Sequence, residues 1–164
     1  MATDALDSAS SLATADTGRI RPLKRLLIAL CVLAVSPAFG AAVGLQSLDE
    51  SKALANQSTL LLAQEKFDGG LQVLKRHWPL PDAELQLVIK QTAAMWPRMR
   101  QRYGRTQGIT FLGEQRLSPT FIRYSYQHRF EKGSGQWQFT FQQYKGAWLV
   151  DGVAFVEPQP TPQG

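Results

Sequence analysis

The stretch that decides the fold is QWQFTFQQYKGAWLVDGVAFVE, residues 136–157. Its first half alternates aromatic and polar residues, so that Trp137, Phe139 and Phe141 share one side of an extended chain. A Lys-Gly pair at 145–146 separates this run from a second apolar run, as is typical of a tight turn between two strands. The stretch therefore predicts an antiparallel hairpin with one aromatic face.

The period of two continues upstream to residue 108 and predicts two more strands, at 109–117 and 120–131. Connections of two to four residues force neighbouring strands to run antiparallel, so the four strands form a meander. The aromatic side of the second strand carries Ile122, Tyr124, Tyr126, His128 and Phe130. In the last strand, Asp151-Gly152 predicts a β-bulge that changes which side chains point inward.

Helical spacing of apolar residues predicts three helices ahead of the strands. Ser47 and Glu50 stand at capping-box spacing and start a helix over 48–66, which the FDGG segment ends. A short helix follows at 71–78, and a long one runs over 81–104. The fold class is therefore α+β, with three N-terminal helices packed on a curved four-stranded antiparallel meander.

This order of elements resembles the nuclear transport factor 2-like (cystatin-like) superfamily. The resemblance rests on the PDAELQLVIKQTAAMW helix and on the Trp-x-Phe-x-Phe strand, Lys-Gly turn and Trp-Leu strand. More narrowly, the chain resembles small exported bacterial members, a family of unknown function, over about residues 48–157. The resemblance implies a curved sheet around a cone-shaped cavity, which relatives use for catalysis, for binding a ligand or protein, or simply fill. Such a fold does not select a function.

The N-terminal segment predicts export. Four basic residues between 19 and 25 precede an apolar run over 26–45 that contains Pro37 and ends in small residues, as in a secretory signal. Cleavage after Gly40 would release a periplasmic protein. Alternatively the run is an uncleaved signal anchor, since about 20 apolar residues can cross a bilayer once. Both interpretations place the rest of the chain outside the cytoplasm, either free or anchored to the inner membrane.

Three segments follow from this interpretation: 1–40 as a polar n-region plus signal, 45–157 as a single domain, and 158–164 as a Pro-rich tail. Cleavage removes Cys31, the only cysteine, so no disulfide stabilises the domain. From Ala41 onward, 14 basic and 10 acidic residues give a net charge of +4, which is modest for a nucleic-acid-binding protein.

Cofactor and metal chemistry finds no support in the sequence. His77 and His128 are the only histidines, and neither has a carboxylate at metal-ligand spacing. The glycines around Ser134 lie in a predicted hairpin and not between a strand and a helix, so they do not form a phosphate-binding loop. We therefore expect neither a metal nor a cofactor.

Two interpretations of the aromatic face remain open: a filled core, or the wall of an apolar pocket. In the second case the expected ligand-binding residues are Tyr124, Tyr126, His128, Trp137, Phe139 and Phe141. An alternative within the superfamily's range is a cofactor-free isomerase or lyase using Tyr103, His128 and Asp151, where burial would raise the pKa of the carboxyl group.

The polar face of the sheet is the other candidate surface. It is predicted to carry Arg116, Arg123, Arg129 and Gln138 and to dock an envelope protein or a second copy of the chain. The function expected from the sequence is that of a non-catalytic, exported accessory or binding protein. It would hold an apolar small ligand in the cone or a partner on the polar face.

Overall fold

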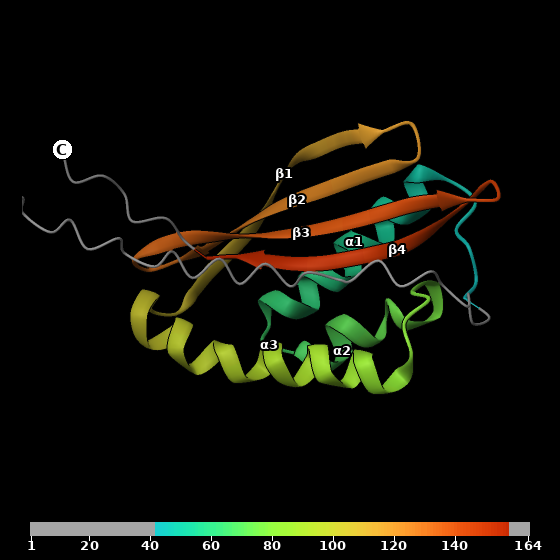
Figure 1. Ribbon diagram of the computed structural model, residues 1–164. Coiled ribbons are helices and arrows are strands. Elements are labelled where there is room, and N and C mark those ends of the chain that lie inside the picture. The colour runs from blue at the N-terminus through green and yellow to red at the C-terminus, as the bar shows by residue number, and fades with distance from the viewer. Residues whose placement is uncertain (1–41, 158–164) are drawn as a thin grey trace, which may run out of the picture.

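The structure is a computed structural model that describes residues 42–157, so the predicted signal segment and Pro-rich tail lie outside the described residues. Three helices precede four strands (Figure 1). The helices are α1 (Leu48–Ala63), α2 (Phe67–Gln72) and α3 (Asp82–Tyr103), with a 3₁₀ turn, Lys75–His77, between α2 and α3. The strands are β1 (Thr106–Ser118), β2 (Phe121–Phe130), β3 (Gly133–Tyr144) and β4 (Ala147–Val156).

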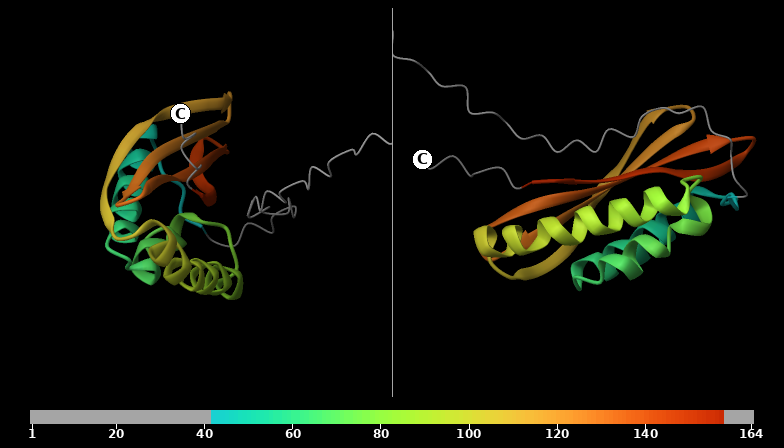
Figure 2. Two further views of the ribbon diagram at one scale, coloured as in Figure 1. Left: turned by 90° about the vertical axis from the view of Figure 1, so that its left-hand side faces the viewer. Right: turned by 60° about the horizontal axis from the view of Figure 1, so that its bottom comes forward.

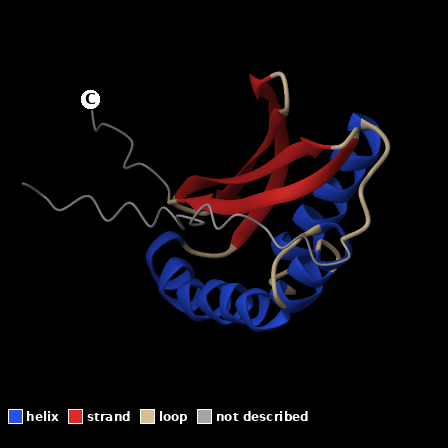
Figure 3. Cartoon of the chain, turned by 45° about the vertical axis from the view of Figure 1, so that its right-hand side comes forward, coloured by secondary structure: helices blue, strands red, loops and turns tan. Residues whose placement is uncertain are grey.

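The four strands form one antiparallel sheet in the order β1-β2-β3-β4, which confirms the predicted meander and the α+β class. The sheet is strongly twisted, as the two views in Figure 2 show. The helices gather on one side of it (Figure 3). On that side lie the aromatic residues of β2 and β3, which are buried and alternate with half-exposed polar residues.

Helix α1 covers one end of the aromatic face and provides hydrogen-bond partners for its tyrosines. Tyr124 donates its hydroxyl to the Leu48 carbonyl at 3.0 Å and lies 2.9 Å from the Ser51 hydroxyl. Tyr126 donates to the Asn56 side chain at 2.7 Å. Because a buried phenol needs such a partner, these bonds fix the position of α1 on the sheet.

The first helix ends at Ala63, close to its predicted end at residue 66, but the FDGG segment does not end it. That segment lies inside α2, so the short helix predicted over 71–78 begins at Phe67 instead and is followed by the 3₁₀ turn. Gly70 lies against α1, where an added Cβ would stand 2.8 Å from Leu62 side-chain atoms. Ser58 also donates its hydroxyl to the Gly70 carbonyl at 2.6 Å. The glycine therefore permits close packing of two helices and does not act as a helix terminator.

The bulge predicted at Asp151-Gly152 is confirmed. Phe141 pairs with Val150 and Thr140 pairs with Gly152, so Asp151 is the extra residue of β4. As a result Val150 and Val153, three positions apart, both point toward the helices and are buried.

A second bulge, in β1, changes the predicted polar face. Phe111 pairs with Tyr126 and Gly113 with Ser125, so that Leu112 is an extra residue and Gly113 takes a φ of 150°, which favours glycine. The residues after the bulge exchange sides, and Arg116 therefore lies opposite Ile122, on the side of the helices. The prediction that Arg116 shares the polar face with Arg123 and Arg129 is wrong for this reason.

Candidate functional site: a groove between α3 and β4

Helix α3 is held against the sheet by one large side chain. Trp96, 3% exposed, points from the middle of α3 onto the aromatic face. Its ring centroid lies 5.2 Å from that of His128, 5.7 Å from Phe155 and 6.3 Å from Trp137. The indole fills the space between α3 and the sheet at this point, and Trp137 and Phe155 also line open space on the β4 side of it.

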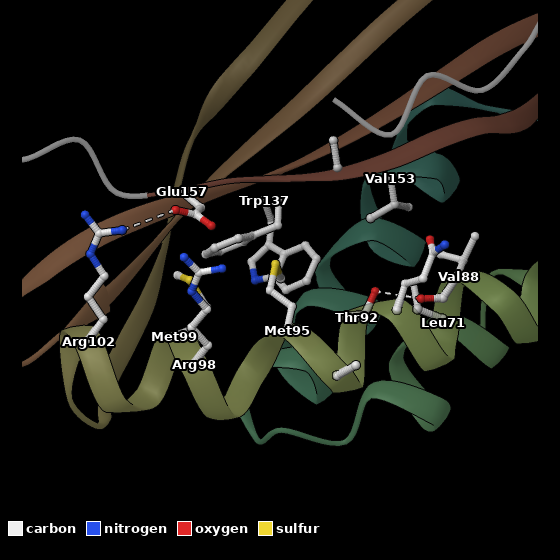
Figure 4. A pocket seen from close by; sticks show the side chains of 14 residues that line it. Leu71, Val88, Thr92, Met95, Arg98, Met99, Arg102, Trp137, Val153 and Glu157 are labelled. Atoms are coloured by element: carbon white, nitrogen blue, oxygen red, sulfur yellow. Dashed lines mark hydrogen bonds and ion pairs between the residues drawn. The ribbon is translucent and has the colours of Figure 1, made fainter. Parts of the chain in front are cut away.

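A groove of about 520 Å³ remains on that side of Trp96. This volume lies within the range of small-molecule sites. We call it the α3–β4 groove, and Figure 4 shows it from close by. Its walls include Leu71 of α2, Val88, Thr92, Met95, Arg98, Met99 and Arg102 of α3, and Trp137, Val153, Phe155 and Glu157 of the sheet and its end.

The walls of the groove are apolar along most of its length. Met99, Trp137 and Phe155 are buried, and Met95 is half-buried. Gln91 also lines the groove, with an exposed side chain. Two other polar groups already have partners: the Thr92 hydroxyl donates to the Val88 carbonyl at 2.9 Å, and the Trp137 indole N–H donates to His128 Nδ1 at 3.2 Å. These two groups therefore offer a ligand no free donor.

Charge is confined to one end of the groove. Arg98 and Arg102 rise from α3 beside Glu157, whereas Val88, Leu71 and Val153 lie at the opposite end (Figure 4). Arg102 Nη1 lies 3.8 Å from Glu157 Oε2, and both side chains are solvent-accessible. Arg98 makes no ion pair with any of residues 42–157.

His128 belongs to the interior and is not exposed. Since an indole N–H can only donate, Nδ1 must accept from Trp137, and the ring proton lies on Nε2, which donates to the Thr106 hydroxyl at 2.9 Å. Burial lowers the pKa of His128 to about 4. The imidazole is therefore neutral near pH 7 and fully hydrogen-bonded.

Of the six residues predicted to bind a ligand, Trp137 lines the groove. Tyr124, Tyr126, Phe139 and Phe141 are buried. Burial raises the pKa of both tyrosines, so both phenols are neutral near pH 7. These four side chains and His128 make up the packed part of the aromatic face.

The three residues of the alternative catalytic set do not converge. Asp151 is exposed at the bulge beside Thr140, and partial burial raises the pKa of its carboxyl group. His128 pairs with Gly135, five residues away along β3, which is about 17 Å at the usual rise per residue. Tyr103 lies near Phe130, with ring centroids 6.2 Å apart, and under the Arg102 guanidinium.

The residues of the predicted partner surface divide between the two sides of the sheet. Arg123, Arg129 and Gln138 lie on the side away from the helices, and Arg116 does not. Arg123 donates to the Thr140 hydroxyl at 3.5 Å, and Gln138 donates to Gln136 at 3.2 Å. The outer face is thus a polar surface whose side chains bind one another.

Within residues 42–157, no three His, Cys, Asp or Glu side chains are grouped so that they could hold a metal ion. None of the helices described there is both long and apolar enough to cross a bilayer.

Sequence reasoning missed the α3–β4 groove, although α3 carries a signal for it. The helix has Val88 and Met95 seven residues apart, followed four residues later by the buried Met99. This stripe is half-buried at Val88 and Met95, which widens the apolar face beyond what the sheet covers. Nothing in the sequence distinguishes Arg98 from Arg100 and Arg102, the other basic residues near the end of this helix.

Comparison with known proteins adds no relative: no protein-family model, curated protein or solved structure matches this chain.

Proposed function

We propose that this chain is an exported, non-catalytic binding protein of the cell envelope that holds an apolar small molecule in the α3–β4 groove. The observation that carries the proposal is the groove itself, about 520 Å³ of solvent-accessible space with apolar walls. Open apolar space of this size is costly to leave in contact with water, and a ligand that covers it would gain hydrophobic free energy. In this proposal the groove is the open part of a nuclear transport factor 2-like cone.

The export part of the proposal rests on the basic and apolar segment at the start of the sequence. We expect the protein recovered from the exported fraction to have the mass of a chain that starts near Ala41. Mass spectrometry under denaturing conditions measures this directly. A mass that retains residues 1–40 would indicate an anchored protein, and recovery in the cytoplasm alone would contradict export.

The ligand part is tested by blocking the groove. Met95→Trp adds a large rigid side chain to its middle and should weaken binding of the uncharged fluorophore Nile red about tenfold or more, since overfilling a packed apolar site costs about 1–3 kcal/mol. Lys90→Trp is the matched control, because Lys90 is exposed on the same helix and does not line the groove. Fluorescence titration gives both affinities.

Two results would contradict groove binding. One is absence of Nile red binding by the unmodified protein. The other is equal binding by the Met95→Trp and Lys90→Trp variants, which would place the dye elsewhere on the surface.

A further inference from the structure

We infer that the occupant of the α3–β4 groove is a free single-chain carboxylate amphiphile, with its carboxylate at Arg98 and its tail toward Val88. This inference rests on the proposed function and names the ligand class. It follows from the shape of the groove, from the position of its charges and from the sum of those charges.

The groove is elongated and follows α3. Its α3 wall extends from Val88 to Arg102, which corresponds to about 21 Å along the helix at the usual rise per residue. Met95 and Met99 form the middle of this wall, and flexible thioether side chains adapt to an unbranched chain. From Arg98 to Val88 the wall is about 15 Å long, and an apolar groove of this length suits an extended alkyl chain better than a compact ring system.

The position of the charges gives the ligand a direction. Arg98 and Arg102 stand four residues apart on one face of α3, so their side chains approach the same end of the groove. At the other end Leu71, Val88 and Val153 are apolar, and the polar side chains of Gln91 and Thr92 carry no charge. A head group therefore belongs at the arginines and a hydrocarbon end at Val88.

The net charge at the arginine end of the groove indicates which head group the ligand carries. Arg98, Arg102 and Glu157 together carry a net charge of +1 at this end, and Glu157 lies beside Arg102. Arg98 has no ionic partner among residues 42–157 and is the available cation. A guanidinium matches a carboxylate with two parallel hydrogen bonds, whereas a dianionic head group would meet the Glu157 carboxylate.

The test compares three ligands of equal chain length by isothermal titration calorimetry of the protein as purified from cells. The ligands are hexadecanoate, hexadecanol and hexadecyltrimethylammonium. Hexadecanoate should bind the most tightly. Arg98→Met should lower the affinity for hexadecanoate roughly tenfold, the usual effect of losing a charge-assisted hydrogen bond. It should leave the affinity for hexadecanol unchanged.

Two further variants at cationic positions make the result specific. Arg98→Lys keeps the charge and should restore part of the hexadecanoate affinity. Arg100→Met is the matched control, because Arg100 lies on the same helix, pairs with Glu65 at 3.3 Å and does not line the groove. It should leave all three affinities unchanged.

The direction of the ligand is tested at the other end of the groove. Val88→Trp shortens the apolar channel, and it should shift the preference from hexadecanoate toward dodecanoate while the dependence on Arg98 remains. Equal losses for both chain lengths would overturn the assigned direction.

The outcomes separate the two proposals. If hexadecanol binds as tightly as hexadecanoate and Arg98→Met changes neither affinity, the carboxylate inference fails and groove binding stands. If none of the three ligands binds but Nile red does, the inference fails and groove binding again stands; if Nile red does not bind either, the proposed function fails as well. A further experiment mixes the protein with phosphatidylglycerol vesicles and measures how much protein sediments with them. If the protein sediments with the vesicles but does not bind free hexadecanoate, the inference is overturned in favour of binding to a membrane surface.

Discussion

Replacing Trp96 by alanine is expected to lower the free energy of unfolding by about 3–5 kcal/mol, the usual cost of removing a buried tryptophan. Trp96 is 3% exposed, and its ring contacts Phe67 of α2 at 5.0 Å as well as the sheet residues. The lost indole would leave a cavity in the layer where α2, α3 and the sheet meet. Because domains are typically stable by only about 5–15 kcal/mol, this loss approaches the whole stability of the fold.

Urea unfolding measures the effect. Trp96→Phe retains a ring at the contact, so its free energy of unfolding should fall less than that of Trp96→Ala. Leu87→Ala is the control on the same helix, because Leu87 is 54% exposed, and it should change stability by no more than about 0.5 kcal/mol. A loss below about 1 kcal/mol for Trp96→Ala would show that α3 is held to the sheet by other contacts.

Acidification is expected to destabilise the protein through His128. The pKa of this imidazole is about 4 in the folded protein and about 6.5 in an unfolded chain. The unfolded state therefore binds more protons between these values, so the contribution of neutral His128 is complete above about pH 6.5 and is lost as the pH falls through about 4. The difference in pKa corresponds to about 3 kcal/mol.

The hydrogen bonds around the ring explain why the folded protein disfavours a protonated His128. A protonated imidazole would present Nδ1–H to the Trp137 indole N–H, so that two donors would face each other in the interior. The imidazole stacks on Phe130, with ring centroids 4.3 Å apart, and is fully buried, so bulk solvent does not screen the two donors from each other.

Carboxylates titrate in the same range, so the measurement is a comparison with His128→Gln. At neutral pH this variant should be less stable than the unmodified protein, because its amide cannot reproduce both hydrogen bonds. The difference should shrink as the pH falls from about 6.5 to about 4. His77→Gln, at the other histidine, is the control for the histidine-to-glutamine exchange itself. A constant difference between the His128→Gln variant and the unmodified protein would show that His128 does not titrate in this range.

Much of the fold was predictable because it depends on local periodicity. The alternation in residues 120–131 and 136–144 predicted which side chains of β2 and β3 are buried, and the structure confirms it. The bulge at Asp151 was predictable as well, since Asp-Gly is unusual inside an apolar strand. The break expected at FDGG was wrong because glycine has two uses, as a terminator and as a contact point, and sequence alone does not distinguish them.

The candidate site was less accessible to sequence reasoning. Trp137 was predicted to bind a ligand and lines the groove, but Tyr124 and Phe139 were predicted by the same periodicity and are packed under the helices. Periodicity identifies the side of a strand and not what covers that side. Arg116 was misplaced for a related reason, because one extra residue at Leu112 reverses the side chains of β1 from Gly113 to Arg116.

The sequence by itself determined the α+β class, the meander and its aromatic face, since each follows from spacing between near neighbours in the chain. Only the tertiary structure decided where that face is filled and where it is open. That depends on how α3 lies on the sheet: Trp96, some forty residues from β3 in sequence, packs against Trp137 and Phe155. These two sheet residues also line the α3–β4 groove, and the half-buried stripe at Val88 and Met95 does not by itself show that the sheet leaves it open.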